Sequence, residues 1–283
     1  MSFKIIGITG SKGVLGQQLI KKFSNVKFDC FKGDISKKKD IKKWLKGKKF
    51  EALFHFAAIV PTQEVSKDFD RSLKVNYHGS KLLIDEVEKN KSTKWFLFAS
   101  TSHVYKFSKS KISEKSIIKP ITKYGLTKLM AEKYLLKKKI KTETCIIRIF
   151  SYTSFNQKKS FFIPSIYKKF RSNDLINLNN VNHVRDFIDI SDIISAIKLL
   201  YRKKSKGIYN LGSSKPIPLK KIIKYFSNMF KKKYMISDNA KKTFLVANVR
   251  KLVKLGWTPK KNIENTLKDY HLGFIRNNKI SIK

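Results

Sequence analysis

Three glycines near the N-terminus constrain the fold of this chain most strongly. Gly10, Gly13 and Gly16 are spaced G-x-x-G-x-x-G. They follow a short apolar run, residues 4–9, and precede a segment of helical apolar spacing, residues 14–23. A glycine turn of this kind lets the backbone approach a phosphate closely, and the helix start offers free N–H groups and the positive end of its dipole. The pattern predicts a strand–turn–helix unit that holds the pyrophosphate of a dinucleotide.

The alternation of strand and helix continues through the first half of the chain. Strands alternating with helices of this length predict an α/β fold with a parallel, doubly wound (Rossmann) sheet. The further strands are expected at residues 26–31, 52–56, 95–100 and 144–149, and the longest helices at 73–87 and 126–136.

The rhythm changes after Phe150. Helical spacing recurs at residues 163–170, 192–201, 219–230 and 263–274, with short strand patterns at 174–178 and 207–211. We therefore expect a dinucleotide-binding domain at residues 1–150 and a smaller α/β substrate-binding lobe at 151–283, although the chain can cross back between them.

The formal net charge of +43 raises the question of a polyanionic partner. Lysines occur in every segment rather than on one stripe, and arginine, the better reader of bases, contributes only seven of the 63 basic residues. Glycine and proline, whose codons are rich in G and C, number only 12 and 6. Lysine, isoleucine, asparagine and phenylalanine, whose codons are rich in A and T, are abundant. We interpret the charge as genome composition and expect no specific nucleic-acid partner.

Two further absences bear on location. No run approaches the roughly 18 apolar residues of a membrane span, so membrane insertion is not expected. Cys30 and Cys145 sit in apolar runs without metal-ligand spacing, which favours buried thiols over a disulfide. With no secretory leader pattern at the start, a cytoplasmic protein without a metal site is expected.

Tyr124 and Lys128 carry the clearest chemical signal. At i and i+4 they share a helix face, although a chain so rich in lysine also produces this spacing by chance. A neighbouring ammonium is expected to lower the tyrosine pKa and so suit it to exchange a proton with a hydroxyl. The hydroxyl run that contains Thr101 ends the strand expected at 95–100, on the sheet edge where a cofactor lies. Hydroxyl, phenol and ammonium are therefore expected to converge at a nicotinamide.

Other strand ends suggest cofactor contacts. Asp34 follows the second strand and is expected to accept a hydrogen bond from the adenine amino group, although it also suits a helix start. Ala57 and Ala58 end the third strand and leave room for a cofactor, or simply pack there.

The choice between NAD and NADP stays open at this point. Asp29 would favour the free ribose hydroxyl of NAD, whereas Lys27 or Lys32 would favour the 2′-phosphate of NADP.

Together these motifs resemble the extended short-chain dehydrogenase/reductase family, in its nucleotide-sugar epimerase, dehydratase and reductase branch. The resemblance runs almost end to end. It rests on T-G-x-x-G-x-x-G from Thr9, Gly33-Asp34-Ile35, His55-x-Ala57-Ala58, Val75-Asn76, Ser100-Thr101 with Val104-Tyr105, Pro120-x-x-x-Tyr124-Gly125-x-x-Lys128, Arg148-Ile149-Phe150, Val184-Arg185-Asp186-Phe187, Gly207-Ile208-Tyr209-Asn210 and Leu255-Gly256-Trp257-Thr258-Pro259.

The resemblance implies roles for individual residues. Thr101, Tyr124 and Lys128 would be catalytic, with Tyr124 as the acid/base, and Arg185 would grip the substrate pyrophosphate unless it forms an ion pair with Asp186 or Asp189. A nucleotide-sugar substrate and a homodimer paired through helices 73–87 and 126–136 are also implied. NAD or NADP would be bound by Gly10, Lys12, Gly13, Val14, Leu15, Gly16, Asp34, Ile35, Ala57, Ala58 and Lys128.

Departures from the family pattern narrow the chemistry. Ser102 and His103 stand where dehydratases carry acidic residues, which disfavours 4,6-dehydration. His103 would serve as a second proton donor or as a packing residue. Ser151 replaces an expected asparagine. The sequence thus predicts a C4 epimerase or 4-keto reductase, the alternative being a non-catalytic nucleotide-sensing or RNA-associated protein on the same fold.

Overall fold

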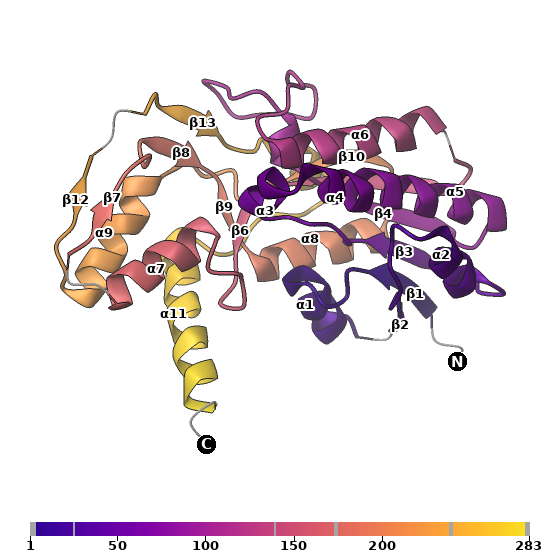
Figure 1. Cartoon of the computed structure of the whole chain (residues 1–283), viewed down its shortest axis with the longest axis horizontal. Helices are drawn as coiled ribbons and strands as arrows, with labels where there is room; N and C mark the ends of the chain where they lie inside the picture. The colour runs from indigo at the N-terminus through magenta and orange to yellow at the C-terminus, as the bar shows by residue number, and fades with distance from the viewer. Residues whose placement is uncertain (1–3, 25, 139, 173–174, 238–239, 281–283) are drawn as a thin grey trace.

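The computed structural model describes residues 4–24, 26–138, 140–172, 175–237 and 240–280. A six-stranded parallel sheet forms its centre, in the order β2-β1-β3-β4-β5-β10. The predicted doubly wound sheet is confirmed (Figure 1). Its strands are β1 (Lys4–Thr9), β2 (Val26–Cys30), β3 (Ala52–His55), β4 (Trp95–Thr101), β5 (Glu143–Ile149) and β10 (Gly207–Leu211).

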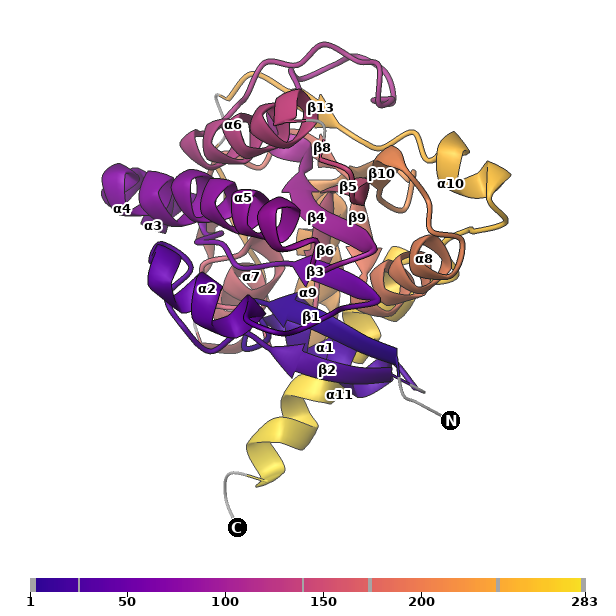
Figure 2. The same ribbon diagram turned by 90° about the vertical axis from the view of Figure 1, so that its right-hand side faces the viewer.

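Helices cover both faces of this sheet, which explains why its inner strands are apolar on both sides (Figure 2). α1 (Val14–Lys22) and α8 (Ile190–Arg202) lie on one face. The opposite face carries α2 (Lys38–Leu45), α5 (Ser80–Asn90) and α6 (Lys123–Lys138). In β4, Trp95 and Leu97 pack toward the first face and Phe96 and Phe98 toward the second, so successive side chains fill two cores.

The strand at residues 207–211 is a place where the chain crosses back to the main sheet. It lies within the range expected for the C-terminal lobe, but as β10 it pairs in parallel with β5 and forms the edge of that sheet. Tyr209 and Leu211 are buried in the core beside α8, and the Asn210 side chain accepts a hydrogen bond from the Tyr105 hydroxyl at 2.7 Å. Burial of these side chains outweighs the position of the strand late in the sequence.

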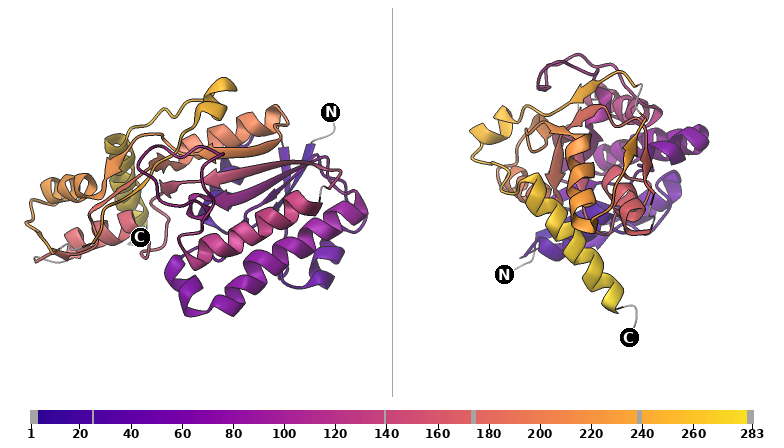
Figure 3. Two further views of the ribbon diagram at one scale, coloured as in Figure 1. Left: turned by 90° about the horizontal axis from the view of Figure 1, so that it is seen from above. Right: turned by 90° about the vertical axis from the view of Figure 1, so that its left-hand side faces the viewer.

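The C-terminal lobe extends the molecule to one side of the sheet (Figure 3). α7 (Phe162–Ser172), α9 (Leu219–Phe230) and α11 (Ile263–Ile280) enclose a separate apolar core. The predicted strand at 174–178 is β7 (Asn177–Leu178), and residue 174 lies outside the described residues. The other short strands are β6 (Ser151–Thr153), β8 (His183–Arg185), β9 (Phe187–Asp189), β11 (Ile217–Pro218), β12 (Met235–Ile236) and β13 (Thr243–Leu245), and the remaining helices are α3 (Thr62–Lys67), α4 (Phe69–Leu73), η2 (Ser102–Val104) and α10 (Arg250–Lys254).

The helix expected at 73–87 is interrupted. A π-helical segment, η1 (Lys74–Gly79), stands between α4 and α5. Within it the Asn76 amide accepts from the Ile59 N–H at 2.8 Å and donates to the Ile59 carbonyl at 2.9 Å. Such wide turns are frequently found at functional sites. Here the widened turn aims an amide at the loop that follows β3.

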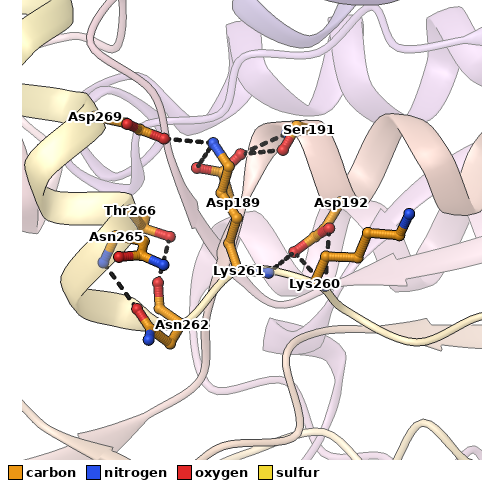
Figure 4. Close-up of polar contacts among 9 residues, drawn as sticks. All are labelled: Asp189, Ser191, Asp192, Lys260, Lys261, Asn262, Asn265, Thr266 and Asp269. Atoms are coloured by element: carbon orange, nitrogen blue, oxygen red, sulfur yellow. Dashed lines mark hydrogen bonds and ion pairs between the residues drawn. The ribbon is translucent and has the colours of Figure 1, made fainter.

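Polar contacts join α11 to the start of α8 (Figure 4). The Asp192 carboxylate accepts the backbone N–H groups of Lys260 and Lys261 at 3.0–3.1 Å. The Lys261 ammonium lies 2.5 Å from Asp269 on α11 and 3.5 Å from Asp189, which caps α8. These contacts fix the lobe against the end of the main sheet.

Within the described ranges, no helix is long and apolar enough to cross a membrane. Both cysteines are free thiols; Cys145 is buried as expected, whereas Cys30 is only half-buried. The boundary at residue 150 stays a prediction.

Candidate active site

The glycine turn is as tight as its sequence predicts. Gly10 has φ +75°, and a Cβ atom there would lie 2.6 Å from the Ala57 backbone nitrogen. A Cβ at Gly16 would lie 2.4 Å from the Gly10 carbonyl oxygen. Gly13 begins α1 without a capping side chain, so the N–H groups of Val14 and Leu15 have no side-chain acceptor. Exposed backbone donors at an uncapped helix start suit a pyrophosphate.

A chain of hydrogen bonds connects this turn to its neighbours. Thr9 Oγ1 lies 2.6 Å from His55 Nδ1, and His55 Nε2 lies 2.8 Å from Ser80 Oγ. Ser80 donates to the Asn76 carbonyl, and the Ala57 N–H donates to Thr9 Oγ1 at 3.3 Å. Burial, reinforced by the Lys128 charge, lowers the pKa of His55 well below its usual value, so the imidazole is neutral. The chain fixes the half-buried loop of Ala57 beside the glycine turn.

The turn after β2 holds Asp34 and Ile35. Asp34 is exposed, and its carboxylate accepts both the N–H and the hydroxyl of Ser36, at 2.9 and 2.8 Å. These bonds lower the pKa of Asp34. Ile35 is buried, and Gly79 leaves it room, since a Cβ there would lie 3.0 Å from Ile35. Asp34 thus shapes a turn before α2, and its contact with adenine stays a prediction.

Lys128 has a buried side chain whose ammonium N–H groups form no hydrogen bond with the described residues. Its side chain is 1% exposed, and Nζ lies 4.2 Å from the centre of the Phe98 ring. In the part of the chain that the structure describes it makes no hydrogen bond and no ion pair. Burial lowers the pKa of Lys128 to about 7, against a smaller opposing effect of Glu132. An ammonium left with its N–H groups free, deep in the fold, fits hydroxyl groups of a bound ribose.

Tyr124 lies one turn before Lys128 on α6. Gly125 lets the first turn of α6 approach the backbone of His103 closely, because a Cβ there would lie 2.3 Å from the His103 carbonyl oxygen. The Tyr124 ring meets the His103 ring edge-on, with centroids 6.1 Å apart. Its hydroxyl, like the Lys128 ammonium, bonds to none of the described residues. The expected lowering of the Tyr124 pKa is wrong: burial, with a contribution from Tyr152, raises it. Desolvation of the phenolate outweighs any benefit from the nearby cation.

Thr101 and His103 form the end of β4 and the following turn. Thr101 is 6% exposed, and its Oγ1 accepts the His103 N–H at 3.2 Å, which leaves the hydroxyl proton free. His103 Nδ1 lies 3.1 Å from Thr122 Oγ1. Burial, and then Arg185, lower the pKa of His103 to about 4, so the ring is neutral near neutral pH. This favours the packing role of His103 over that of a proton donor.

Arg185 ends β8 close enough to affect His103. Its guanidinium donates to the carbonyls of Val184 and Thr243 and lies over the Phe107 ring, 5.2 Å from its centre. Burial lowers its pKa to about 10. Among the described residues it has no ion pair, so the alternative of a pair with Asp186 or Asp189 is wrong.

The Asp186 carboxylate instead accepts bonds from Ser213, Ser214 and Ala247. This carboxylate connects β8, the segment after β10 and the region of β13. The guanidinium of Arg185 thus has no carboxylate partner among the residues that the structure describes.

Two contributors escaped the sequence analysis. Tyr152 on β6 lies near Tyr124 and directly follows Ser151, the residue that departs from the family pattern. Glu132, one turn beyond Lys128, is buried and accepts three hydrogen bonds from Arg148, one from Nη2 at 2.6 Å and two from Nε at 3.1 and 3.2 Å. Its spacing of four residues from Lys128 was the signal that could have found it.

Three comparisons agree with this arrangement. A profile described as "NAD dependent epimerase/dehydratase family" matches residues 6–212. The dTDP-4-dehydro-6-deoxyglucose reductase of Escherichia coli is 26% identical, over 89% of this chain and 92% of its own length. Two solved structures are similar in fold. RMD from Pseudomonas aeruginosa, complexed with NADPH, has a TM-score of 0.85 at 21% identity, covering 94% of this chain and 97% of its own. UDP-glucose 4-epimerase from Thermotoga maritima, with UDP-glucose, has a TM-score of 0.82 at 19% identity, covering 97% and 99%.

Proposed function

Because the chain belongs to the NAD dependent epimerase/dehydratase family, we propose that it is an NAD(P)-dependent nucleotide-sugar epimerase or reductase. It acts at the sugar C4 carbinol or ketone. One observation carries this proposal: the side chains of Tyr124 and Lys128, 9% and 1% exposed, lie one helical turn apart, and neither the hydroxyl nor the ammonium hydrogen-bonds to any described residue. Polar groups of such side chains normally have a hydrogen-bond partner, so this pair suits contact with a bound ligand.

The residues around the glycine turn fit a dinucleotide. The backbone from Gly10 to Gly16 holds the pyrophosphate, and Lys12 is exposed within it. Asp34 and Ile35 contact the adenine, Ala57 and Ala58 line the crevice, and Lys128 holds the nicotinamide ribose. The bound nicotinamide supplies or accepts a hydride at C4.

Thr101 and Tyr124 act on the C4 oxygen. Thr101 donates its free hydroxyl proton to that oxygen and orients the sugar. Tyr124 gives a proton to the oxygen during reduction and removes one during oxidation. The raised pKa keeps Tyr124 protonated in the chain alone, which is the form that reduction needs. Lys128, held by burial beside Phe98, places a positive charge near the phenol as negative charge develops.

Arg185 binds the diphosphate of the substrate. Its guanidinium is half-buried and anchored through backbone carbonyls, and no carboxylate neutralises it among the described residues. A planar cation of this kind binds diphosphate oxygens through paired hydrogen bonds.

Replacing Tyr124 by phenylalanine tests the proposal. We expect Y124F to lower turnover of a nucleotide 4-keto-6-deoxy sugar by about 100-fold or more, because the variant lacks only the proton-transfer group. Dinucleotide binding is expected to stay within about threefold, since the ring and Lys128 remain. Tyr134 on the same helix, bonded to Asp85 rather than free, gives the matched control Y134F.

The results separate three outcomes. Near-normal turnover in Y124F would remove Tyr124 from the mechanism. A wild-type chain that binds dinucleotide yet turns over no dTDP-, UDP- or GDP-linked sugar would favour the non-catalytic alternative. Salt-dependent RNA binding would strengthen that alternative.

A further inference from the structure

The residues around the adenosine end of the proposed dinucleotide site discriminate between two cofactors. In folds of this type, an acidic side chain about 20 residues after the first glycine accepts the ribose hydroxyls of NAD, whereas a cation there accommodates the 2′-phosphate of NADP. By distance along the chain, Asp29 near the end of β2 is the acidic residue closest to that position, and it pairs with Gly7 of β1. The Phe31 N–H donates to the Ile8 carbonyl at 2.9 Å, so the chain after β2 continues alongside the start of the glycine turn.

The Asp29 carboxylate is already occupied. Its Oδ1 accepts the indole N–H of Trp44 at 2.7 Å, and its Oδ2 lies 2.6 Å from the Lys48 ammonium. Trp44 is buried in the α2 face of the sheet. Both oxygens are therefore directed at α2 and the residues just after it, and a ribose hydroxyl would have to displace one of these donors.

The next two carboxylates in the chain are only partly used. Asp34 accepts both bonds from Ser36 through Oδ1, and Asp40 accepts the Asp34 N–H through Oδ2 at 2.9 Å. The second oxygen of Asp34 stays available for the adenine amino group of the proposed site. Of these three carboxylates, Asp29 is the one with both oxygens bonded to the protein.

Two lysines of this region are exposed, whereas Lys48 pairs with Asp29. Lys32 is the second residue after β2, and Lys12 lies within the glycine turn. Neither forms an ion pair with any carboxylate that the structure describes. Two free ammonium groups at the turn favour an anion over a hydroxyl.

We propose that this chain selects NADPH over NADH, and that Lys32 and Lys12 bind the 2′-phosphate while Asp29 serves only to fix β2 to α2. The inference rests on the proposed function. It also gives that function a direction: the sugar C4 ketone is reduced to a carbinol, C4 takes the hydride, the oxygen takes the Tyr124 proton, and NADPH is left as NADP⁺. The substrate must then come from a reaction that leaves a ketone at C4 of a nucleotide sugar, by oxidation or by elimination of water.

Equilibrium titrations with NADPH and with NADH, followed by tryptophan fluorescence or calorimetry, test the inference. We expect NADPH to bind at least about tenfold more tightly, and K32E to reduce this preference about tenfold by weakening NADPH alone. Lys224, an exposed lysine of α9 in the distant lobe, provides K224E as a control with the same change in net charge. K224E should leave the preference unchanged.

Asp29 provides a second and independent test. D29N keeps an acceptor for Trp44, and it should leave the ratio of the two affinities unchanged if the carboxylate only fixes α2. Selective loss of NADH affinity in D29N, or equal or tighter binding of NADH by the wild type, would overturn the inference and leave the proposed function standing. Failure of both dinucleotides to bind would instead overturn the proposed function itself.

Discussion

Lys128 illustrates how single residues here carry an energetic cost. An ammonium held at 1% exposure without a carboxylate partner loses most of its hydration, and its pKa falls to about 7. The unfolded chain binds that proton up to a pKa near 10.5. The folded chain therefore bears the full cost below about pH 7, and the cost declines as the pH rises toward 10.5.

Replacing Lys128 by methionine is expected to stabilise the fold while it impairs function. At pH 7, K128M should raise the free energy of unfolding by about 2–4 kcal/mol. The methionine side chain is of similar length to that of lysine, and it removes the buried charge. Chemical denaturation between pH 6.5 and 9.5 would check this, and the advantage should shrink as the pH rises. K133M, at an exposed lysine of the same helix, is the control. A K128M variant with a lower free energy of unfolding than wild type at pH 7 would show that the buried ammonium does not destabilise the fold.

At the scale of elements, α6 reaches its place only because residue 125 has no side chain. In an exposed helix, replacing glycine by alanine usually stabilises by about 0.5–1 kcal/mol. In G125A the added methyl would lie 2.3 Å from the His103 carbonyl, so α6 must move away from η2. We expect G125A to destabilise by about 1–3 kcal/mol and to lower turnover, because Tyr124 moves with the helix.

Urea denaturation and steady-state kinetics of G125A would check both effects. L126A, at the exposed neighbouring residue, reports any general change in the helix. Higher stability in G125A with unchanged turnover would contradict the close contact between α6 and η2.

Regular elements could be predicted from the sequence because their signals are local. The strands β3 and β4 carry continuous apolar runs, and the helix at residues 219–230 matches its periodicity from end to end. The π-helical segment around Asn76 could not be predicted, because the bonds that accompany it join Asn76 to Ile59, 17 residues earlier, and leave no mark on the local periodicity. The same limit hid the Asp29 contacts with Trp44 and Lys48, and it produced the wrong direction for the Tyr124 pKa, which depends on burial by other elements.

At the scale of the whole molecule, the charge of +43 bears on self-association. The predicted homodimer would pair α5 and α6. On that face lies an open groove of about 600 Å³, lined by Tyr77, Met130, Lys133, Tyr134, Lys137 and Lys138. Leu126 and Leu136 on α6 are 41% and 48% exposed. Apolar area there favours pairing, while the lysines of two copies repel each other at low ionic strength.

We therefore expect a homodimer that strengthens with salt. Light scattering at about 50 and 500 mM NaCl should show the dimeric fraction rising, because the Debye length shortens from beyond 10 Å to a few ångströms. L136K should weaken the dimer, whereas V253K, at an exposed residue of α10, should not. A monomer at every salt concentration would contradict the predicted pairing.

The late return of β10 to the sheet governs how this protein can be made. During synthesis, β5 leaves the ribosome before its partner β10 has been made. The outer edge of β5 stays unpaired until about 60 further residues, up to residue 211, have been synthesised. An open apolar edge is a template for aggregation. A nascent chain stalled near residue 150 would therefore expose the unpaired edge of β5. Chaperone binding to that edge would then limit aggregation until β10 is synthesised.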